Sequence, residues 1–199
     1  MQGLLKFDSR IVPVTTGCLL LTALLAVVAL LLLKREEPLL PKVGSHLYWS
    51  AFLASDVQNG GASSGYVKES EEYLELYMTL RDGYAFPYVN WAINFPHTDD
   101  DGVVRYADLS AYDGVEFKAK CGAFNVMSLI LTTCDPVVTK PERWESYRMA
   151  EKFFSCEPTE QSIYIEFDQV LVPRWWLSEN AQPASDQSKD LSKVNSLAF

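Results

Sequence analysis

The sequence has few of the residues that metal-dependent and nucleophilic catalysis require. It contains only 2 histidines, His46 and His97, and neither lies at metal-ligand spacing from a cysteine or from the other histidine. G-x-S-x-G, H-E-x-x-H, P-loop and dinucleotide-binding motifs are absent from it. Acidic residues are plentiful enough for the paired carboxylates of a glycosidase, but their context singles out no pair. We therefore expect that this chain is not an enzyme.

Positive charge is also scarce. The chain has 17 lysines and arginines against 26 aspartates and glutamates, which gives a net charge of -9 at pH 7. A protein that tracks the phosphates of a nucleic acid needs the opposite sign. We therefore expect no nucleic acid as a partner of this chain.

Charge is missing altogether from one long segment near the start of the chain. Residues 17–33 (GCLLLTALLAVVALLLL) contain no charged side chain, and the apolar segment extends back to Ile11. At about 1.5 Å per residue, a helix over residues 11–33 is long enough to cross a hydrocarbon core of ~30 Å. The residues Lys34 and Arg35 follow it where a cleavage site would lie, so we predict an uncleaved signal anchor, a single transmembrane helix.

The charges that flank the anchor do not decide its orientation. Lys6 and Arg10 precede it, and Lys34, Arg35 and Lys42 follow it. We expect the N-terminus inside and the remaining domain outside, because a ten-residue head is readily retained. The expected localisation is the inner (plasma) membrane, with a periplasmic domain and the lipid bilayer as a partner. The expected organisation is a head (1–10), an anchor (11–33), a juxtamembrane linker (34–45) and a domain (46–199).

Beyond the linker the hydrophobic pattern has a period of two. Apolar and polar residues alternate in four segments, and the apolar run Met127–Thr133 is typical of a central strand. Turn signals such as Asp82-Gly83 and Asp101-Gly102 separate the segments. Short strands at this spacing predict an antiparallel β-sandwich rather than βαβ units. The four alternating segments are 73–80, 88–95, 115–121 and 163–168.

Four motifs follow one another between residues 46 and 199. They are DVQNGGASS at Asp56–Ser64, DLSAYDGVEF at Asp108–Phe117, IYIEF at Ile163–Phe167 with Val172-Pro-x-Trp175 after it, and DLSKVNSLAF at Asp190–Phe199. In this order they resemble the motifs of galactose-binding-like jelly rolls, which include family-11-type carbohydrate-binding modules and the complex I intermediate-associated protein 30 group. The resemblance implies an all-β antiparallel jelly-roll sandwich in residues 46–199, and it implies that the family's last strand is missing.

The resemblance also suggests a function. Similar domains form the extracytoplasmic input halves of bacterial membrane signalling proteins. It therefore implies a membrane-anchored module that binds a saccharide or another small polar ligand and acts as the sensory part of a signalling protein. The alternative, implied by the complex I intermediate-associated relatives, is an assembly or structural factor that binds a protein partner; a glycosidase ranks last.

Sugar binding needs flat apolar surfaces for the C–H faces of the ring, together with side chains that donate and accept hydrogen bonds. The polar phases of the predicted strands and the loop after the IYIEF strand supply both. Two consecutive tryptophans cannot point into one strand face, so we expect one of them in the core. An ordinary solvated sheet face is the competing interpretation. The predicted ligand-binding residues are Tyr88, Asn90, Asn94, Tyr164, Glu166, Arg174, Trp175 and Trp176.

Two loops carry side chains that could bind a ligand, and we interpret both as turns. Asp99 and Asp101 offer oxygen ligands to Ca²⁺, and galactose-binding-like folds often carry a structural calcium. Their spacing is not that of an EF-hand, so we favour a solvated acidic turn over a calcium site and expect no other cofactor or metal. The motif Asp56–Ser64 is interpreted as a turn-forming signature.

The chain contains 4 cysteines. Cys18 lies in the predicted anchor, and the odd count in the domain leaves at least one cysteine unpaired in a monomer. If strand 115–121 and the strand ending near Cys156 both flank strand 126–134, Cys121 and Cys156 meet at one end of the sheet. We predict this disulfide, with Cys134 as a buried thiol; three reduced cysteines are the alternative.

Overall fold

The computed structural model describes residues 21, 24–25, 38–39, 46–70 and 74–199 of the chain. The chain divides into two units, Met1–Arg35 and Glu36–Phe199. Most of the predicted head, anchor and linker lies outside the described residues; Leu21, Leu24 and Leu25 of the anchor are helical and exposed. A search of the described part found no helix long and apolar enough to span a bilayer. The transmembrane helix therefore stays a prediction.

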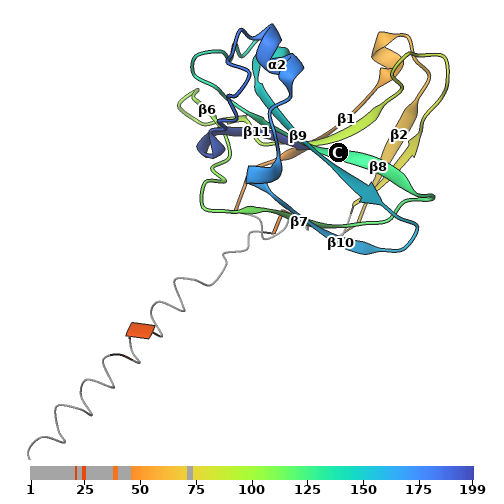
Figure 1. Ribbon diagram of the computed structural model, residues 1–199, viewed down its shortest axis with the longest axis horizontal. Helices are drawn as coiled ribbons and strands as arrows, with labels where there is room; N and C mark the ends of the chain where they lie inside the picture. Colours follow the sequence, from red (N-terminus) through yellow and green to blue (C-terminus); the bar gives the residue numbers. More distant parts are fainter. Residues whose placement is uncertain (1–20, 22–23, 26–37, 40–45, 71–73) are drawn as a thin grey trace, which may run out of the picture. The chain divides into compact units, whose positions relative to one another are not determined.

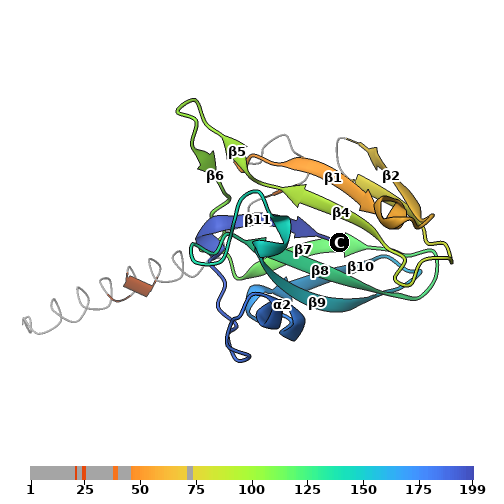
Figure 2. The same cartoon turned by 90° about the horizontal axis from the view of Figure 1, so that it is seen from above.

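Five antiparallel strands form the main sheet of the second unit, in the order β1-β4-β11-β8-β9. Figure 2 shows these strands side by side. The strand β11 comes from the far end of the chain and lies in the middle of the sheet. The strands are β1 (Ser50–Ser55), β4 (Val89–Asn94), β11 (Val194–Ala198), β8 (Asn125–Thr133) and β9 (Arg148–Cys156).

A second layer covers one face of the main sheet. The strands β7 (Gly114–Ala119) and β10 (Gln161–Glu166) pair antiparallel and lie against the sheet in both views (Figures 1 and 2). Phe117 of β7 contacts Phe154 of β9 edge-on, with ring centroids 5.2 Å apart. The mostly β, antiparallel architecture that the alternation predicted is confirmed.

Smaller elements complete the domain. The hairpin of β2 (Ser64–Glu69) and β3 (Leu74–Thr79) packs against β1 and β4. Gly65 permits this approach, because a Cβ there would lie 2.8 Å from a methyl group of Val89. The remaining elements are β5 (His97–Thr98), β6 (Val104–Arg105), the helix α2 (Arg174–Glu179) and the 3-10 helices η1 (Asp56–Asn59), η2 (Trp144–Ser146), η3 (Phe167–Gln169) and η4 (Leu191–Lys193).

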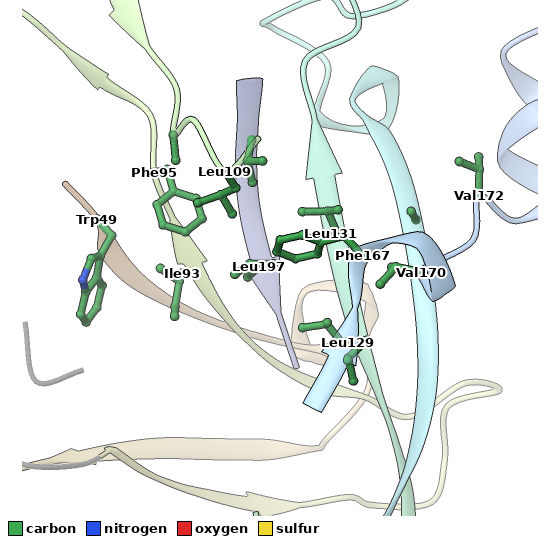
Figure 3. Close-up of a cluster of buried hydrophobic side chains, with 14 of the residues drawn as sticks. Trp49, Ile93, Phe95, Leu109, Leu129, Leu131, Phe167, Val170, Val172 and Leu197 are labelled. Atoms are coloured by element: carbon green, nitrogen blue, oxygen red, sulfur yellow. The ribbon is translucent and has the colours of Figure 1, made fainter. Parts of the chain in front are cut away.

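The core lies between the layers (Figure 3). Trp91, Ile93 and Phe95 alternate along and just beyond β4 and are all buried, as the period-two pattern predicted. Leu129 and Leu131 of β8 extend the same surface and are fully buried. Each such side chain contributes about 1.5–3 kcal/mol relative to an exposed one, so this face of the sheet is committed to packing.

The motif Asp56–Ser64 forms the turn between β1 and β2. The side chain of Asp56 is fully buried. One of its carboxylate oxygens accepts from the Ser63 N–H (2.8 Å), and the other accepts from the Ser63 hydroxyl (2.6 Å) and the Tyr88 N–H (3.3 Å). Gly61 lies directly against this carboxylate, where a Cβ would overlap it. The motif therefore builds a turn, as we interpreted it from sequence.

The DLSAYDGVEF motif joins distant parts of the chain. The Leu109 N–H donates to the Leu191 carbonyl (2.7 Å), and the Phe167 N–H donates to the Asp113 carbonyl (2.8 Å). Gly114 lies against the Ile165 carbonyl so closely that a side chain would overlap it. These residues of the resemblance thus hold β7 against β10 and η4.

The reasoning behind the predicted disulfide was wrong about one neighbour. The strand β8 is flanked by β11 and β9, whereas β7 pairs with β10 in the other layer. A period-two pattern shows which side chains share a face, but it does not show which strands pair. The structure nevertheless joins Cys121, just after β7, to Cys156 at the end of β9, with Cα atoms 5.6 Å apart. Cys134 is a half-buried free thiol.

Candidate ligand-binding face

The main sheet has a second face, made by the side chains that alternate with the core residues. We call it the outer face. One row of directly paired residues crosses all five strands on this face. The alanines at its centre are short, so the middle of the row lies lower than its flanks. The row consists of Phe52, Ala92, Ala198, Ile130 and Glu151.

The next row on the outer face is polar. Asn94 pairs with Ser196, and Ser196 pairs with Thr132. The Thr132 and Ser196 hydroxyl oxygens lie 2.7 Å apart, and the Asn195 side-chain amide donates to Thr132 at 3.1 Å. Amides and hydroxyls both donate and accept hydrogen bonds, so this row can pair with ligand hydroxyls in either direction.

Aromatic rings lie on the two edge strands of the outer face. Phe52 of β1 is 51% exposed, and Phe153 of β9 is 63% exposed. Solvent reaches both rings, so each offers an apolar surface to a ligand. Among the outer-face residues of the five strands, Glu151 is the single charged side chain. The face therefore suits an uncharged ligand with apolar and hydroxyl surfaces.

The structure brings two of the eight predicted ligand-binding residues onto the outer face. Asn90 and Asn94 both lie on β4 in the outward phase. Tyr88 lies just before β4 and turns toward η1, where its hydroxyl accepts from the Asn59 amide at 3.2 Å. Its backbone N–H is the one that binds Asp56. Tyr88 thus borders the face at the η1 turn.

Tyr164 and Glu166 lie in the second layer. Both belong to β10, whose inward residues Ile163 and Ile165 contribute to the core, so Tyr164 and Glu166 point away from it. Glu166 accepts a hydrogen bond from Gln169 at 2.8 Å. These two residues therefore face the opposite side of the domain from Asn90 and Asn94, because strand pairing placed β10 in the other layer.

The segment Arg174–Glu179 is an α-helix, where we had expected a loop. Pro173 precedes it in an extended conformation that suits a helix start. Trp176 is 1% exposed, and its indole N–H donates to the Glu145 carbonyl at 3.1 Å. Trp175 is 49% exposed. One tryptophan is thus a core residue and the other is on the surface, with Arg174 exposed beside it, and none of the three belongs to a strand of the outer face.

Sequence reasoning missed four residues of the outer face: Phe52, Thr132, Phe153 and Ser196. The alternation in SAFLAS at Ser50–Ser55 was the available signal for Phe52. Phe153 lies outside the alternating segments identified in the sequence, so no phase was assigned to it. Ser196 becomes part of the face only because β11 inserts beside β4, which its own sequence does not specify.

The acidic turn is occupied by its own contacts. Asp99 accepts from the Asp101 and Val103 N–H groups, at 3.1 and 2.9 Å, and from the Arg105 side chain at 2.7 Å. The N–H of Val103 and the Arg105 side chain lower the Asp99 pKa. No cluster of three or more metal-ligating side chains was found in the part of the chain that the structure describes. Asp99 is thus held by hydrogen bonds from within its own loop.

Two solved structures resemble the fold. One is the family 11 carbohydrate-binding module of the cellulosomal cellulase Lic26A-Cel5E of Clostridium thermocellum, with 15% identity, a TM-score of 0.49, and 82% of this chain and 84% of that chain covered. The other is a family 11 carbohydrate-binding module from Clostridium thermocellum in complex with a β-1,3-1,4-mixed-linked tetrasaccharide, with 13% identity, a TM-score of 0.46, and 76% and 77% covered. No protein-family model and no curated protein matches the chain. At this identity, no site residue is carried over.

Proposed function

We propose that the domain is a non-catalytic carbohydrate-binding module whose outer face holds a neutral saccharide. The observation that carries the proposal is that one sheet face holds both the polar row at Asn94, Ser196 and Thr132 and the exposed rings of Phe52 and Phe153. Ring C–H faces stack on such aromatic surfaces, while hydroxyls bind amides and serine or threonine side chains.

The dimensions of the outer face favour a chain of sugars over a single one. Neighbouring strands lie about 4.8 Å apart, so the five strands of the main sheet span ~19 Å. Phe52 and Phe153 lie on the two edge strands, β1 and β9. A linear oligosaccharide laid across the strands reaches both rings, and the polar row lies beside it, next to the row that holds Phe52.

Calorimetric titration tests this site. The full chain, in a detergent without a sugar headgroup, is titrated with soluble linear oligosaccharides. We expect Phe153→Ala to weaken binding about fivefold to tenfold, because a stacking surface is lost. Asn94→Ala loses hydrogen bonds and should weaken it about fivefold.

The matched control is Tyr164→Ala, which removes an exposed aromatic ring from the other layer. It should leave the affinity unchanged. Normal affinity in both outer-face variants, together with a loss in Tyr164→Ala, would move the site to β10 and contradict the proposal.

The proposal extends to location and signalling. A helix over 11–33 would anchor the domain outside the plasma membrane, where the Cys121–Cys156 disulfide is compatible with an oxidising compartment. There the domain serves as the ligand-sensing part of a signalling protein. Protease added to intact spheroplasts should cleave the β-domain. Complete protection, with cleavage after lysis, would place the domain on the cytoplasmic side.

A protein partner is the second candidate, and one observation favours it. Phe124, Val126 and Phe153 are 66%, 59% and 63% exposed at the adjoining ends of β8 and β9. Clusters of exposed apolar side chains often mark protein interfaces. A stable complex recovered from solubilised membranes and lost in Val126→Ser, without any saccharide binding, would favour an assembly role.

A further inference from the structure

A second polar site lies at the same end of strands β8 and β9 as the polar row, but on the opposite face of the main sheet. Arg148 begins β9, and its side chain is only 4% exposed. Its Nε and Nη2 atoms donate to one carboxylate oxygen of Asp135, at 3.0 and 2.7 Å. Its guanidinium group also lies 4.9 Å from the centre of the Trp176 ring. The arginine is therefore held rigidly between β8, β9 and α2.

A pocket opens beside this arginine. Its volume is about 370 Å³, which is large enough for a small organic molecule. Asp135, Arg148 and Thr133 line it from the sheet, and Ser188, Lys189 and Asp190 line it from the segment before η4. It is distinct from the outer face, because Thr133 points to the other side of β8 from Thr132.

Two buried groups that line the pocket lack hydrogen-bond partners within the described part of the chain. The Thr133 hydroxyl is one, in a residue that is 1% exposed. The Nη1 atom of Arg148 is the other: it forms an ion pair with an Asp186 oxygen 3.0 Å away but no geometrically aligned hydrogen bond. Buried polar groups in folded proteins are normally paired. An oxygen atom from a ligand that accepts from both would pair them.

The charges at the pocket select the class of ligand. Two carboxylates, Asp135 and Asp186, already face the arginine, and Asp190 faces the pocket with Lys189. An anion would meet the two carboxylates that line the pocket, Asp135 and Asp190. A metal cation would meet a buried guanidinium group. A neutral molecule rich in hydroxyls meets donors and acceptors on the same wall.

We propose that this pocket binds a single neutral sugar residue, either a free monosaccharide or the end of a longer chain. One hydroxyl oxygen accepts hydrogen bonds from Thr133 and Arg148, and neighbouring hydroxyls donate to Asp135 and Asp190. The choice of a sugar rests on the proposed function. The pocket itself rests on the unpaired Thr133 and Arg148 groups.

The test is an NMR titration of the full chain in a detergent without a sugar headgroup. The probes are D-glucose and D-galactose, with acetate and CaCl₂ as charged comparisons. The reporters are the Thr133 amide and the Arg148 Nε–H, which is hydrogen-bonded to Asp135. We expect at least one sugar to shift both signals saturably and neither charged probe to do so.

Adjacent threonines provide matched variants. Thr133→Val should weaken monosaccharide binding at the pocket about tenfold, because a buried hydroxyl no longer contacts the ligand. Thr132→Val should leave the pocket unaffected and weaken oligosaccharide binding at the outer face. Ser188→Ala, on the opposite wall, provides a second pocket variant and should weaken the sugar about threefold.

Two results overturn the proposal: no saturable shift with either sugar, or shifts caused by acetate or Ca²⁺ alone. They are separable from failure of the outer face, which the Asn94 side-chain amide reports during oligosaccharide titration. If the Asn94 signal shifts but the Thr133 and Arg148 signals do not, the pocket proposal is wrong and the proposed function stands. If the Thr133 and Arg148 signals shift but the Asn94 signal does not, the outer-face site is wrong and the pocket proposal stands.

Discussion

Asp56 and Arg148 are both buried charged side chains, yet their surroundings differ. Asp56 accepts three hydrogen bonds, two from Ser63 in its own turn and one from the Tyr88 N–H. Arg148 faces two carboxylates and a tryptophan ring, but its Nη1 atom and the nearby Thr133 hydroxyl lack hydrogen bonds. The hydrogen bonds of Asp56 are all made by the chain itself, whereas the Arg148 site keeps two groups that can still form hydrogen bonds with a ligand.

This difference distinguishes a buried group that stabilises the fold from one that can bind a ligand. A buried group whose hydrogen bonds are all made by the chain fixes a conformation and has nothing left for a ligand. A buried group that lacks hydrogen bonds and lies beside a pocket can form them with a ligand in that pocket. Asp56 is therefore assigned to the fold and Arg148 to a candidate site, and substitutions at the two positions should differ accordingly.

The largest effect is expected for Arg148→Met. This change keeps most of the side-chain length but leaves Asp135 and Asp186 without their buried partner, so unfolding should require about 3–5 kcal/mol less free energy. Urea denaturation followed by tryptophan fluorescence measures this. The control is Lys118→Met, which breaks the ion pair of Lys118 with Glu160, whose side chains are 72% and 64% exposed. It should lower the free energy of unfolding by ~1 kcal/mol or less. Equal losses in the two variants would mean that Arg148 is not effectively buried.

Asp56→Ala should come second, with a loss of about 3 kcal/mol. The alanine leaves the Ser63 N–H and hydroxyl without their acceptor and opens a gap beside Gly61. Saccharide affinity, measured at a temperature where the variant remains folded, should not change. A variant with wild-type stability and reduced affinity would show that Asp56 contacts ligand and is not purely architectural.

Acid should weaken the Arg148 site next. Burial raises the pKa of Asp135, but the hydrogen bonds from Arg148 and from the Val137 N–H outweigh it and lower the pKa. The Ser188 hydroxyl and N–H lower the pKa of Asp186. Since both values are depressed in the folded state, the unfolded chain takes up protons first as the pH falls. The free energy of unfolding should therefore decrease from about pH 4 downward.

Arg148→Met distinguishes this source of acid sensitivity from the others. Without the guanidinium group, the Asp135 pKa is less depressed in the folded state, so the decrease in stability below about pH 4 should be shallower. Lys118→Met should keep the wild-type slope. Parallel slopes in all three proteins would show that other carboxylates dominate acid unfolding.

The same contrast explains how far the sequence could be interpreted. The contacts of Asp56 are mostly local, and its motif was recognisable as a turn. The alternation along residues 88–95 likewise placed Trp91 in the core and Asn90 and Asn94 on a polar face. Each of these inferences depends on residues close together in the chain.

The Arg148 site was not predictable in the same way. Its partners Asp135, Trp176 and Asp186 come from three separate segments, and no spacing links them. The same limit separated Tyr164 and Glu166 from Asn94, because the layer of β10 depends on its pairing with β7. Contacts that form only through strand pairing and loop packing leave no local signal in a single sequence.

The smallest expected effect is the most direct comparison of the two sites. The Ser63 hydroxyl donates to Asp56 and accepts from the Arg81 N–H at 3.1 Å, so Ser63→Ala should cost about 1–2 kcal/mol. The Thr133 hydroxyl makes no hydrogen bond within the described residues. Thr133→Val replaces it with a methyl group of the same shape, so stability should stay within about 0.5 kcal/mol or rise slightly. If Thr133→Val were as destabilising as Ser63→Ala, the Thr133 hydroxyl would be hydrogen-bonded in the folded protein. It would then no longer be available to a ligand in the pocket beside Arg148.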